Sequence, residues 1–272
     1  MNIHDLYVSE GAKPKFRRGG TEAGCLLIHG FSAAPAEITW LGDHLHETLN
    51  LTTYAPRLTG HGTDPQHMRR MHWPDWYASV CDGYELLAAQ CEKVFVAGIS
   101  MGGLLALLLM ACEESQIEAG AVIAAPIYYK HNRVAATRYL KYLQRMKSMP
   151  DKSTMPDLLR EEQERRGEPV IGRTHYNVWS LQAVAQLYDL TLIVRDHLPQ
   201  IATPMTLLYA ENDHSVALES IEAIKTQTRA ERIETHILEQ SGHIITQDIE
   251  REKAFTVTEQ FFSQFLIGEG AR

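Results

Sequence analysis

Short apolar runs alternate along the chain with stretches in which apolar residues recur every three or four positions. The runs indicate buried strands, and the three-to-four spacing indicates amphipathic helices. The predicted strands are Gly24–Ile28, Thr52–Ala55, Lys93–Ile99, Ala119–Ala125, Met205–Ala210 and Ile233–Leu238. The predicted helices are Pro35–Leu49, a helix opened by Pro74, Met101–Cys112 and Ala254–Phe265. This alternation favours an α/β fold with a mainly parallel sheet and helices on both faces.

The alternation stops in the second half of the chain. From Tyr128 to about Leu190 there is no strand-like run, but several amphipathic helical stretches occur. We therefore predict a core domain of residues 1–126 and 191–272 with a helical cap insert, residues 127–190. Ten of the 26 basic residues but only five acidic ones fall between Lys130 and Arg166. We interpret them as the solvated face of capping helices, and a surface for an anionic partner is the alternative.

Composition and charge narrow the classes of function. Apolar residues make up 44% of the 272 residues, enough for the core of one ordinary domain. The formal net charge of −8 gives no basic footprint, so we predict no nucleic-acid partner. No apolar run approaches the roughly 20 residues that span a bilayer, and the N-terminus lacks the layout of a signal peptide. With four cysteines and no close pair among them, these features predict a soluble cytoplasmic protein.

The segment Gly98-Ile99-Ser100-Met101-Gly102 points to chemistry. It fits G-x-S-x-G directly after a predicted strand and directly before an apolar helix, where a sharp turn exposes a nucleophilic serine. The alternative is a serine that caps the helix of a nucleotide-binding fold. That fold requires a glycine-rich fingerprint or a phosphate loop, and the sequence has neither. We therefore predict that Ser100 is a nucleophile.

A serine nucleophile needs a base, and the base needs a carboxylate that orients it. Because active-site groups of open α/β sheets gather at the carboxyl ends of the strands, His243, just after the last predicted strand, is the candidate base. The preceding strand is followed by Glu211 and Asp213. We prefer Asp213, which lies farther beyond the strand end, and Asp196 is a third choice. The chain order Ser100, Asp213, His243 is that of α/β-hydrolases.

The tetrahedral intermediate of acyl transfer needs at least two hydrogen-bond donors for its oxyanion. The turn around Ser100 supplies the backbone N–H of Met101. The loop after the first predicted strand reads His29-Gly30-Phe31-Ser32, and the N–H of Phe31 is the second candidate. We expect the side chain of His29 to brace this loop by hydrogen bonding.

No motif indicates a metal ion or a cofactor, and we predict neither. The spacings H-E-x-x-H and C-x-x-C do not occur. Epoxide and haloalkane hydrolases use an aspartate as nucleophile, whereas position 100 is a serine.

Four segments carry a family resemblance: Leu-Leu-Ile-His-Gly-Phe, Gly-Ile-Ser-Met-Gly-Gly, Ala-Glu-Asn-Asp and Ser-Gly-His-Ile. In this order the chain resembles bacterial serine carboxylesterases and monoacylglycerol lipases of the α/β-hydrolase fold. The resemblance covers roughly residues 24–265 apart from the insert. It implies hydrolysis of short to medium acyl esters without a cofactor. It assigns the nucleophile to Ser100, the acid to Asp213, the base to His243, and the oxyanion donors to Phe31 and Met101.

The resemblance also implies a helical cap over the acyl pocket, and we expect Tyr128, Tyr129, Leu181 and Leu187 to face acyl chains there. The predicted partner is a small acyl ester. A monoacylglycerol lipase stays open, as does a thioesterase, lactonase or acyltransferase with the same triad, because pocket and lid decide specificity. A receptor that uses the fold without turnover is the non-enzymatic alternative.

Overall fold

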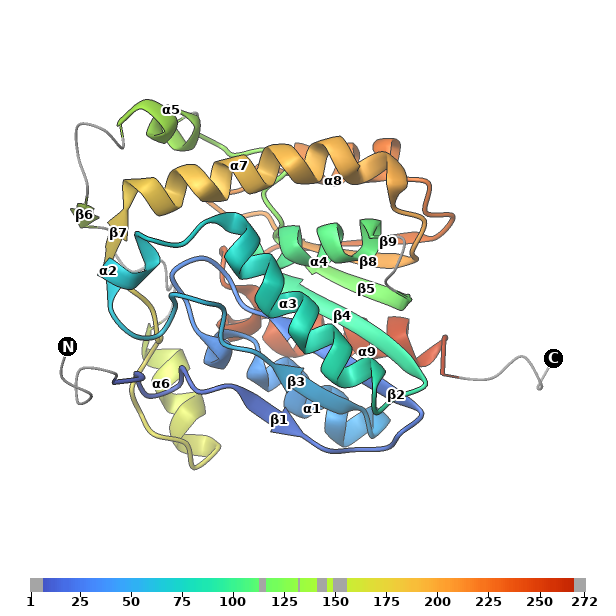
Figure 1. Cartoon of the computed structure of the whole chain (residues 1–272). Helices are drawn as coiled ribbons and strands as arrows, with labels where there is room; N and C mark the ends of the chain where they lie inside the picture. The colour runs from blue at the N-terminus through green and yellow to red at the C-terminus, as the bar shows by residue number, and fades with distance from the viewer. Residues whose placement is uncertain (1–6, 113–115, 132, 141–145, 149–155, 267–272) are drawn as a thin grey trace.

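A seven-stranded sheet runs through the centre of the computed structural model, which describes residues 7–112, 116–131, 133–140, 146–148 and 156–266 (Figure 1). The strand order is β1-β3-β2-β4-β5-β8-β9, and neighbouring strands are parallel except β1 with β3. The strands are β1 Lys15–Arg17, β2 Ala23–Ile28, β3 Thr52–Ala55, β4 Lys93–Ile99, β5 Ile117–Ile123, β8 Met205–Ala210 and β9 Ile233–Leu238.

Helices cover both faces of this sheet, as predicted. One face carries α1 (Thr39–Leu49) and α9 (Arg251–Ser263); the other carries α3 (Trp73–Ala88), α4 (Met101–Ala111), α7 (Leu181–His197) and α8 (Glu219–Gln227). Since side chains alternate along a strand, Leu26 and Ile28 of β2 join one apolar cluster, and Cys25 and Leu27 join the other. Short elements complete the core: η2 Pro35–Glu37, α2 Pro65–Met68, η3 Leu198–Gln200 and η4 Ile245–Gln247. The predicted α/β-hydrolase fold is confirmed.

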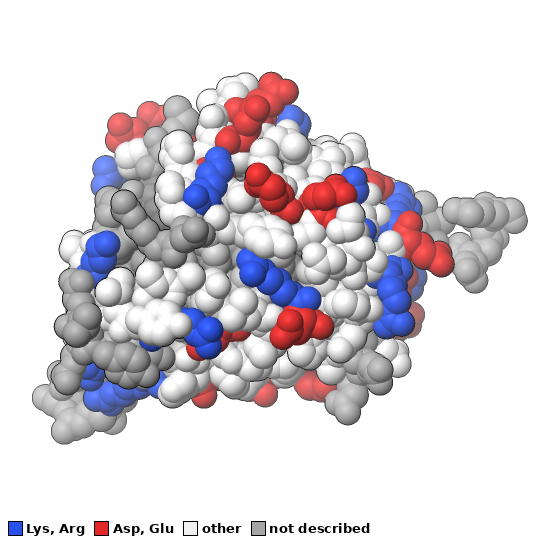
Figure 2. Space-filling view, turned by 90° about the horizontal axis from the view of Figure 1, so that it is seen from above, with Lys and Arg blue, Asp and Glu red and all other residues white. Residues whose placement is uncertain are grey.

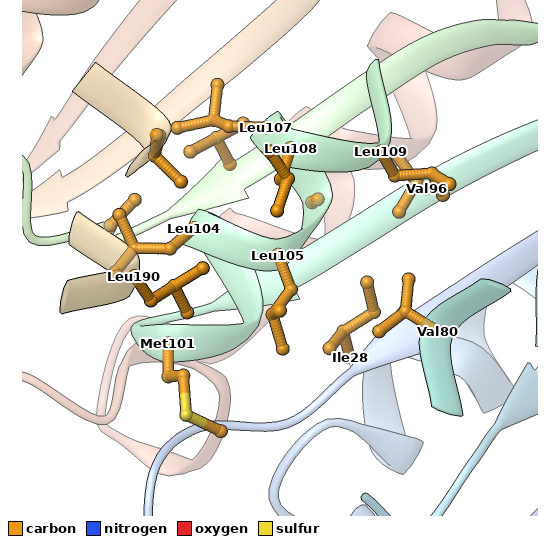
Figure 3. Close-up of a cluster of buried hydrophobic side chains, with 14 of the residues drawn as sticks. Ile28, Val80, Val96, Met101, Leu104, Leu105, Leu107, Leu108, Leu109 and Leu190 are labelled. Carbon is orange, nitrogen blue, oxygen red and sulfur yellow. The ribbon is translucent and has the colours of Figure 1, made fainter. Parts of the chain in front are cut away.

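The helix α4 is buried along its whole length, which explains why its sequence is apolar on every side. Figure 3 shows Leu104 beside Leu190 of α7, while Leu105 points toward Ile28 and Val80. Each fully buried leucine contributes about 1.5–3 kcal/mol relative to exposure. The N-terminus of α4, which follows Ser100 directly, is therefore held firmly against the sheet.

Most predicted strands are found within two residues of their expected bounds, but three short strands were not predicted. The edge strand β1 has no fully buried residue and gives no periodic signal. In the insert, the prediction of no strand is wrong, because β6 (Met146–Ser148) pairs antiparallel with β7 (Val178–Ser180). Strands of three residues are too short to show an alternating pattern.

Two helix predictions also differ from the structure. The predicted helix Pro35–Leu49 is divided into the 3-10 turn η2 and the helix α1. The helix α8 was not predicted, and α9 begins at Arg251, before the expected start at Ala254.

The insert divides between two sides of the molecule. The helix α5 (Arg133–Leu140) packs on α7, at the top of Figure 1. The helix α6 (Pro156–Arg165) packs on the opposite side, where Leu159 joins the apolar cluster of α1 and α9 and Arg251 donates to Glu162 at 3.0 Å. Thus α6 does not cover the same region as α5. The helix α7 continues past the expected boundary at residue 190, and the division into core and insert stays a prediction.

Several basic residues of the insert pair with acidic neighbours. The Arg138 guanidinium lies 3.1 Å from Asp189, and Arg165 and Arg166 both pair with Glu162. On the face that Figure 2 shows, the described Lys and Arg side chains are scattered among Asp and Glu. This distribution agrees with a solvated helical surface. Within the described residues, no helix has the length and apolarity needed to cross a bilayer.

Candidate active site

Ser100 lies in a strained turn between β4 and α4. Its backbone has φ 56° and ψ −118°, in a region that residues other than glycine rarely occupy. The flanking glycines allow the chains to approach: a Cβ at Gly98 would collide with the carbonyl of Gly102, and a Cβ at Gly102 would collide with that of Ile28. The turn therefore has the geometry that G-x-S-x-G predicted.

His243 connects Ser100 to Asp213. The Nε2 atom of His243 lies 2.9 Å from the Oγ atom of Ser100, and its Nδ1 atom lies 2.6 Å from Oδ2 of Asp213. The three residues follow three strands, β4, β8 and β9. The other two candidate acids, Glu211 and Asp196, are exposed, and within the described chain neither bonds to His243. The structure thus brings together the three residues that the sequence order selected.

The surroundings of Asp213 favour its charged form. Burial alone would raise the pKa of the carboxyl group, but the nearby His243 and its hydrogen bond outweigh burial. The N–H groups of Ser215, at 2.6 Å, and Val216, at 3.1 Å, also donate to Oδ1, so the pKa lies below its ordinary value. An ionised Asp213 holds the proton of His243 on Nδ1, which leaves Nε2 free to accept the Ser100 proton.

The two candidate oxyanion donors flank this site. Met101 is the first residue of α4, so its N–H has no partner within the helix. Among the described residues, neither this N–H nor that of Phe31 donates to a backbone carbonyl. Both groups are therefore available to a ligand beside Ser100.

His29 braces the loop that carries Phe31, as expected. Its Nδ1–H donates to the carbonyl of Gly30 at 2.9 Å, and its Nε2 accepts the N–H of Leu58 at 3.2 Å. Because the ring is fully buried, its pKa falls to about 4. His29 is thus a neutral ring with both nitrogens engaged.

A cavity of about 290 Å³ opens onto Ser100 and His243. Of the residues expected to face acyl chains, Tyr129, Leu181 and Leu187 line it. The expectation for Tyr128 is wrong. Its side chain is 39% exposed, and the guanidinium of Arg195 lies 4.4 Å from its ring centroid.

Other apolar residues of the cavity were missed by the sequence reasoning. They are Phe31, Pro126, Val134, Trp179, Val184, Val216 and Ile244. The ring of Trp179 packs edge-on against Phe31, with centroids 5.4 Å apart. Leu181, Val184 and Leu187 are spaced by three residues on α7, so they lie on one face of the helix. This spacing could have predicted that Val184 lines the same wall of the cavity as the other two.

Charged residues also reach the cavity. Among its described lining residues, Glu37 is the only carboxylate, and Arg173 lies 2.7 Å from it. In the part of the chain that the structure describes, no three His, Cys, Asp or Glu side chains are grouped to hold a metal ion. The arrangement can activate a hydroxyl, hold an oxyanion and accommodate an apolar chain.

Comparisons with known proteins agree with this geometry. Residues 19–250 match the family model described as serine aminopeptidase, S33. A carboxylesterase of Bacillus subtilis (strain 168) is 30% identical over 241 residues, which are 88% of this chain and 92% of that protein. A thermostable monoacylglycerol lipase of Bacillus sp. (strain H-257) is 28% identical over 94% of this chain and 96% of its own length.

Solved structures share the fold. A structure from work on the metagenome-derived lipolytic enzymes LipS and LipT has a TM-score of 0.83 at 24% identity, and the match covers 95% of this chain and 100% of that one. A monoacylglycerol lipase of Paleococcus ferrophilus has a TM-score of 0.71 at 14% identity over 93% and 99% of the two chains.

Proposed function

Because the chain belongs to the serine aminopeptidase (S33) family and is a serine ester hydrolase, we propose that it cleaves carboxylic esters of short to medium acyl chains through an acyl-enzyme on Ser100. His243 is the general base of this mechanism, and Asp213 orients it. The observation that carries the proposal is the hydrogen-bonded series from Asp213 through His243 to Ser100, at the end of an apolar cavity.

The proposed reaction has two halves. In the first, the Oγ atom of Ser100 attacks the ester carbonyl carbon while its proton passes to Nε2 of His243. The N–H groups of Phe31 and Met101 bind the oxyanion, and His243 then gives its proton to the departing alcohol. In the second half, His243 takes a proton from water as that water attacks the acyl carbonyl carbon. His243 then returns the proton to the Oγ atom of Ser100 as the carboxylic acid leaves. Asp213 stabilises the imidazolium in both halves.

The charges in the cavity favour an ester over the peptide that the family's description suggests. An aminopeptidase must bind the ammonium group of a peptide N-terminus, and a carboxylate is the usual partner for such a group. Glu37 is the only carboxylate among the described lining residues, and its charge is already matched by Arg173.

A monoacylglycerol lipase is the second candidate, supported by the relative of that name from Bacillus sp. (strain H-257). A panel of p-nitrophenyl esters, monoacylglycerols, acyl thioesters and an amino-acid p-nitroanilide separates the candidates, with Ser100→Ala as control. We expect turnover of p-nitrophenyl esters with acyl chains of short to medium length. Faster turnover of monoacylglycerols at equal chain length would favour the lipase, and turnover of the anilide alone would overturn the ester proposal.

We further propose that residues 127–190 act as a cap through α5, β7 and the part of α7 that they include. Five apolar lining residues support this: Val134, Trp179, Leu181, Val184 and Leu187.

We also propose that the protein is located in the cytoplasm. Cell fractionation followed by an esterase assay of each fraction tests this location.

A further inference from the structure

A buried ion pair lies beside the loop that carries Phe31. The Oε2 atom of Glu37 accepts the N–H of Gly30 at 2.8 Å. Its Oε1 atom accepts from Nη2 of Arg173 at 2.7 Å and from Nε at 3.2 Å. The two side chains are only 2% and 6% exposed, and both residues line the cavity that contains Ser100. The pair therefore belongs to the walls of the site.

Arg173 comes from the insert, on a loop that is fixed by its neighbours. The Oε1 atom of Gln163 accepts the N–H groups of Ile171 and Gly172, and its Nε2 donates to the carbonyl of Gly172. The preceding residue, Glu162, accepts from Arg251 of the core at 3.0 Å. These bonds fix the loop that carries Arg173.

The same loop also holds the other side of Phe31. The N–H of Tyr176 donates to the carbonyl of Ser32 at 2.9 Å. Ser32 has φ 63°, in the left-handed region, so this bond stabilises an unfavourable backbone conformation. The hydroxyl of Tyr176 in turn donates to Gly60 at 3.0 Å. Residues 173–176 thus hold both neighbours of Phe31, one through Glu37 and one directly.

The charge of Glu37 matters because of its position. A Cβ at Gly30 would lie 2.8 Å from Oε2 of Glu37 and 3.4 Å from the Cβ of Ser100. The carboxylate and the nucleophilic serine are therefore both close neighbours of Gly30. Burial raises the pKa of Glu37, but the charge and hydrogen bonds of Arg173 outweigh burial, and the group is ionised. Without a partner cation, this carboxylate would repel the oxyanion that forms beside it.

We infer that Arg173 is a positioning residue for the proposed ester hydrolysis: through Glu37 it fixes the Gly30–Ser32 loop, and it cancels a negative charge beside the oxyanion. The insert then supplies part of the oxyanion-binding arrangement as well as a cover for the pocket. This inference rests on the proposed function.

The test compares Arg173→Gln, Glu37→Gln and the double variant by kcat and KM on an uncharged p-nitrophenyl ester. Loss of a whole oxyanion donor lowers kcat about 10²–10³-fold. We expect Arg173→Gln to lower kcat about 10- to 100-fold with little change in KM, because it leaves an unmatched carboxylate. Glu37→Gln keeps an oxygen for Gly30 and should lower kcat only about threefold. The double variant should recover part of the loss seen in Arg173→Gln.

This asymmetry separates positioning from a simple structural role. Equal losses from both single variants, or a change in KM alone, would overturn the inference. Arg138→Gln is the matched control, since Arg138 belongs to the same insert but is half exposed and pairs with Asp189, and neither residue lines the cavity. The affinity for a trifluoromethyl ketone, whose adduct places an oxyanion in the same position, should fall in parallel with kcat.

If Arg173→Gln does not fold, Glu37→Gln and the double variant still decide the matter, because they differ only in the cation. We then expect kcat about twofold higher when Arg173 is present, because the amide oxygen at position 37 can still accept from it, and equal values would refute the inference. If the wild-type protein hydrolyses no ester at all, the proposed function fails instead. If Arg173→Gln hydrolyses the ester with the kcat of the wild type, the role inferred for Arg173 is wrong, but the proposed function stands.

Discussion

The Oγ atom of Ser100 lies 2.9 Å from the Nε2 atom of His243, although the two residues are 143 positions apart in the sequence. The strand order brings them together, since β4, β5, β8 and β9 are consecutive and parallel in the sheet. Their carboxyl ends therefore meet at one edge, where the loops can place a nucleophile, an acid and a base within reach of one another.

The first prediction concerns Ser100. Replacing Ser100 with Ala should reduce ester turnover to background, because the nucleophilic oxygen is lost while the packing of α4 is retained. A serine-directed phosphonate should label the wild-type protein at Ser100, as mass spectrometry of the digested protein would show. Ser32 and Ser215 also line the cavity and should stay unlabelled. Labelling that persists in Ser100→Ala would show that another residue is the nucleophile.

The second prediction concerns the acid. Asp213→Asn should lower kcat about 10⁴-fold, because the amide no longer selects the right tautomer of His243 or stabilises its charged form. Steady-state kinetics on a p-nitrophenyl ester measures the loss. Glu211→Gln is the matched control, two residues away and exposed, and should keep kcat within about twofold of wild type. A larger loss in Glu211→Gln than in Asp213→Asn would contradict the assignment.

The core and its motifs could be predicted because their signals are local. Uniformly apolar segments such as β4 and α4 are buried on all sides, and the G-x-S-x-G turn between them has few alternatives. His243 and Asp213 followed from their places after strands. The resemblance to bacterial carboxylesterases and monoacylglycerol lipases is confirmed by the family match and the relatives.

The insert could not be predicted to the same depth, because its signals are not local. Glu37 and Arg173 are 136 residues apart in the sequence. The residues around each of them do not indicate that this carboxylate and this guanidinium will meet beside the Gly30–Ser32 loop. Tyr128 differs from Tyr129 only in the direction of its side chain, which depends on where α7 and α8 pack. Periodicity finds helices such as α6, but it does not say which face of the sheet a helix covers.

The third prediction concerns acyl-chain length. Val184 is buried in the wall that α7 contributes to the cavity. Val184→Trp should fill part of this space and lower kcat/KM for octanoyl and longer esters at least tenfold relative to acetyl esters. Gln182→Trp, on the exposed side of the same helix, is the control and should leave the preference unchanged. An unchanged preference in Val184→Trp would show that acyl chains bind elsewhere.

The last prediction concerns stability at mildly acidic pH. Burial lowers the pKa of His29 from 6.5 to about 4 in the folded protein, and protonation of its Nε2 would break the hydrogen bond from Leu58. Between these two values the unfolded chain binds a proton that the folded chain does not, so the free energy of unfolding falls as the pH falls. From pH 7 to pH 5, His29 alone should remove about 2 kcal/mol. Burial also lowers the pKa of His61, which acts in the same direction.

Urea unfolding at pH 7 and pH 5 measures this effect. His29→Gln cannot take up the proton, so its free energy of unfolding should depend less steeply on pH than that of the wild type, even if its stability at pH 7 is lower. His131→Gln, at an exposed position, is the control, and its free energy of unfolding should depend on pH as that of the wild type does. If His29→Gln and the wild type lose the same free energy between pH 7 and pH 5, His29 is protonated in the folded protein. Its role as a neutral brace of the Gly30–Phe31 loop would then be wrong.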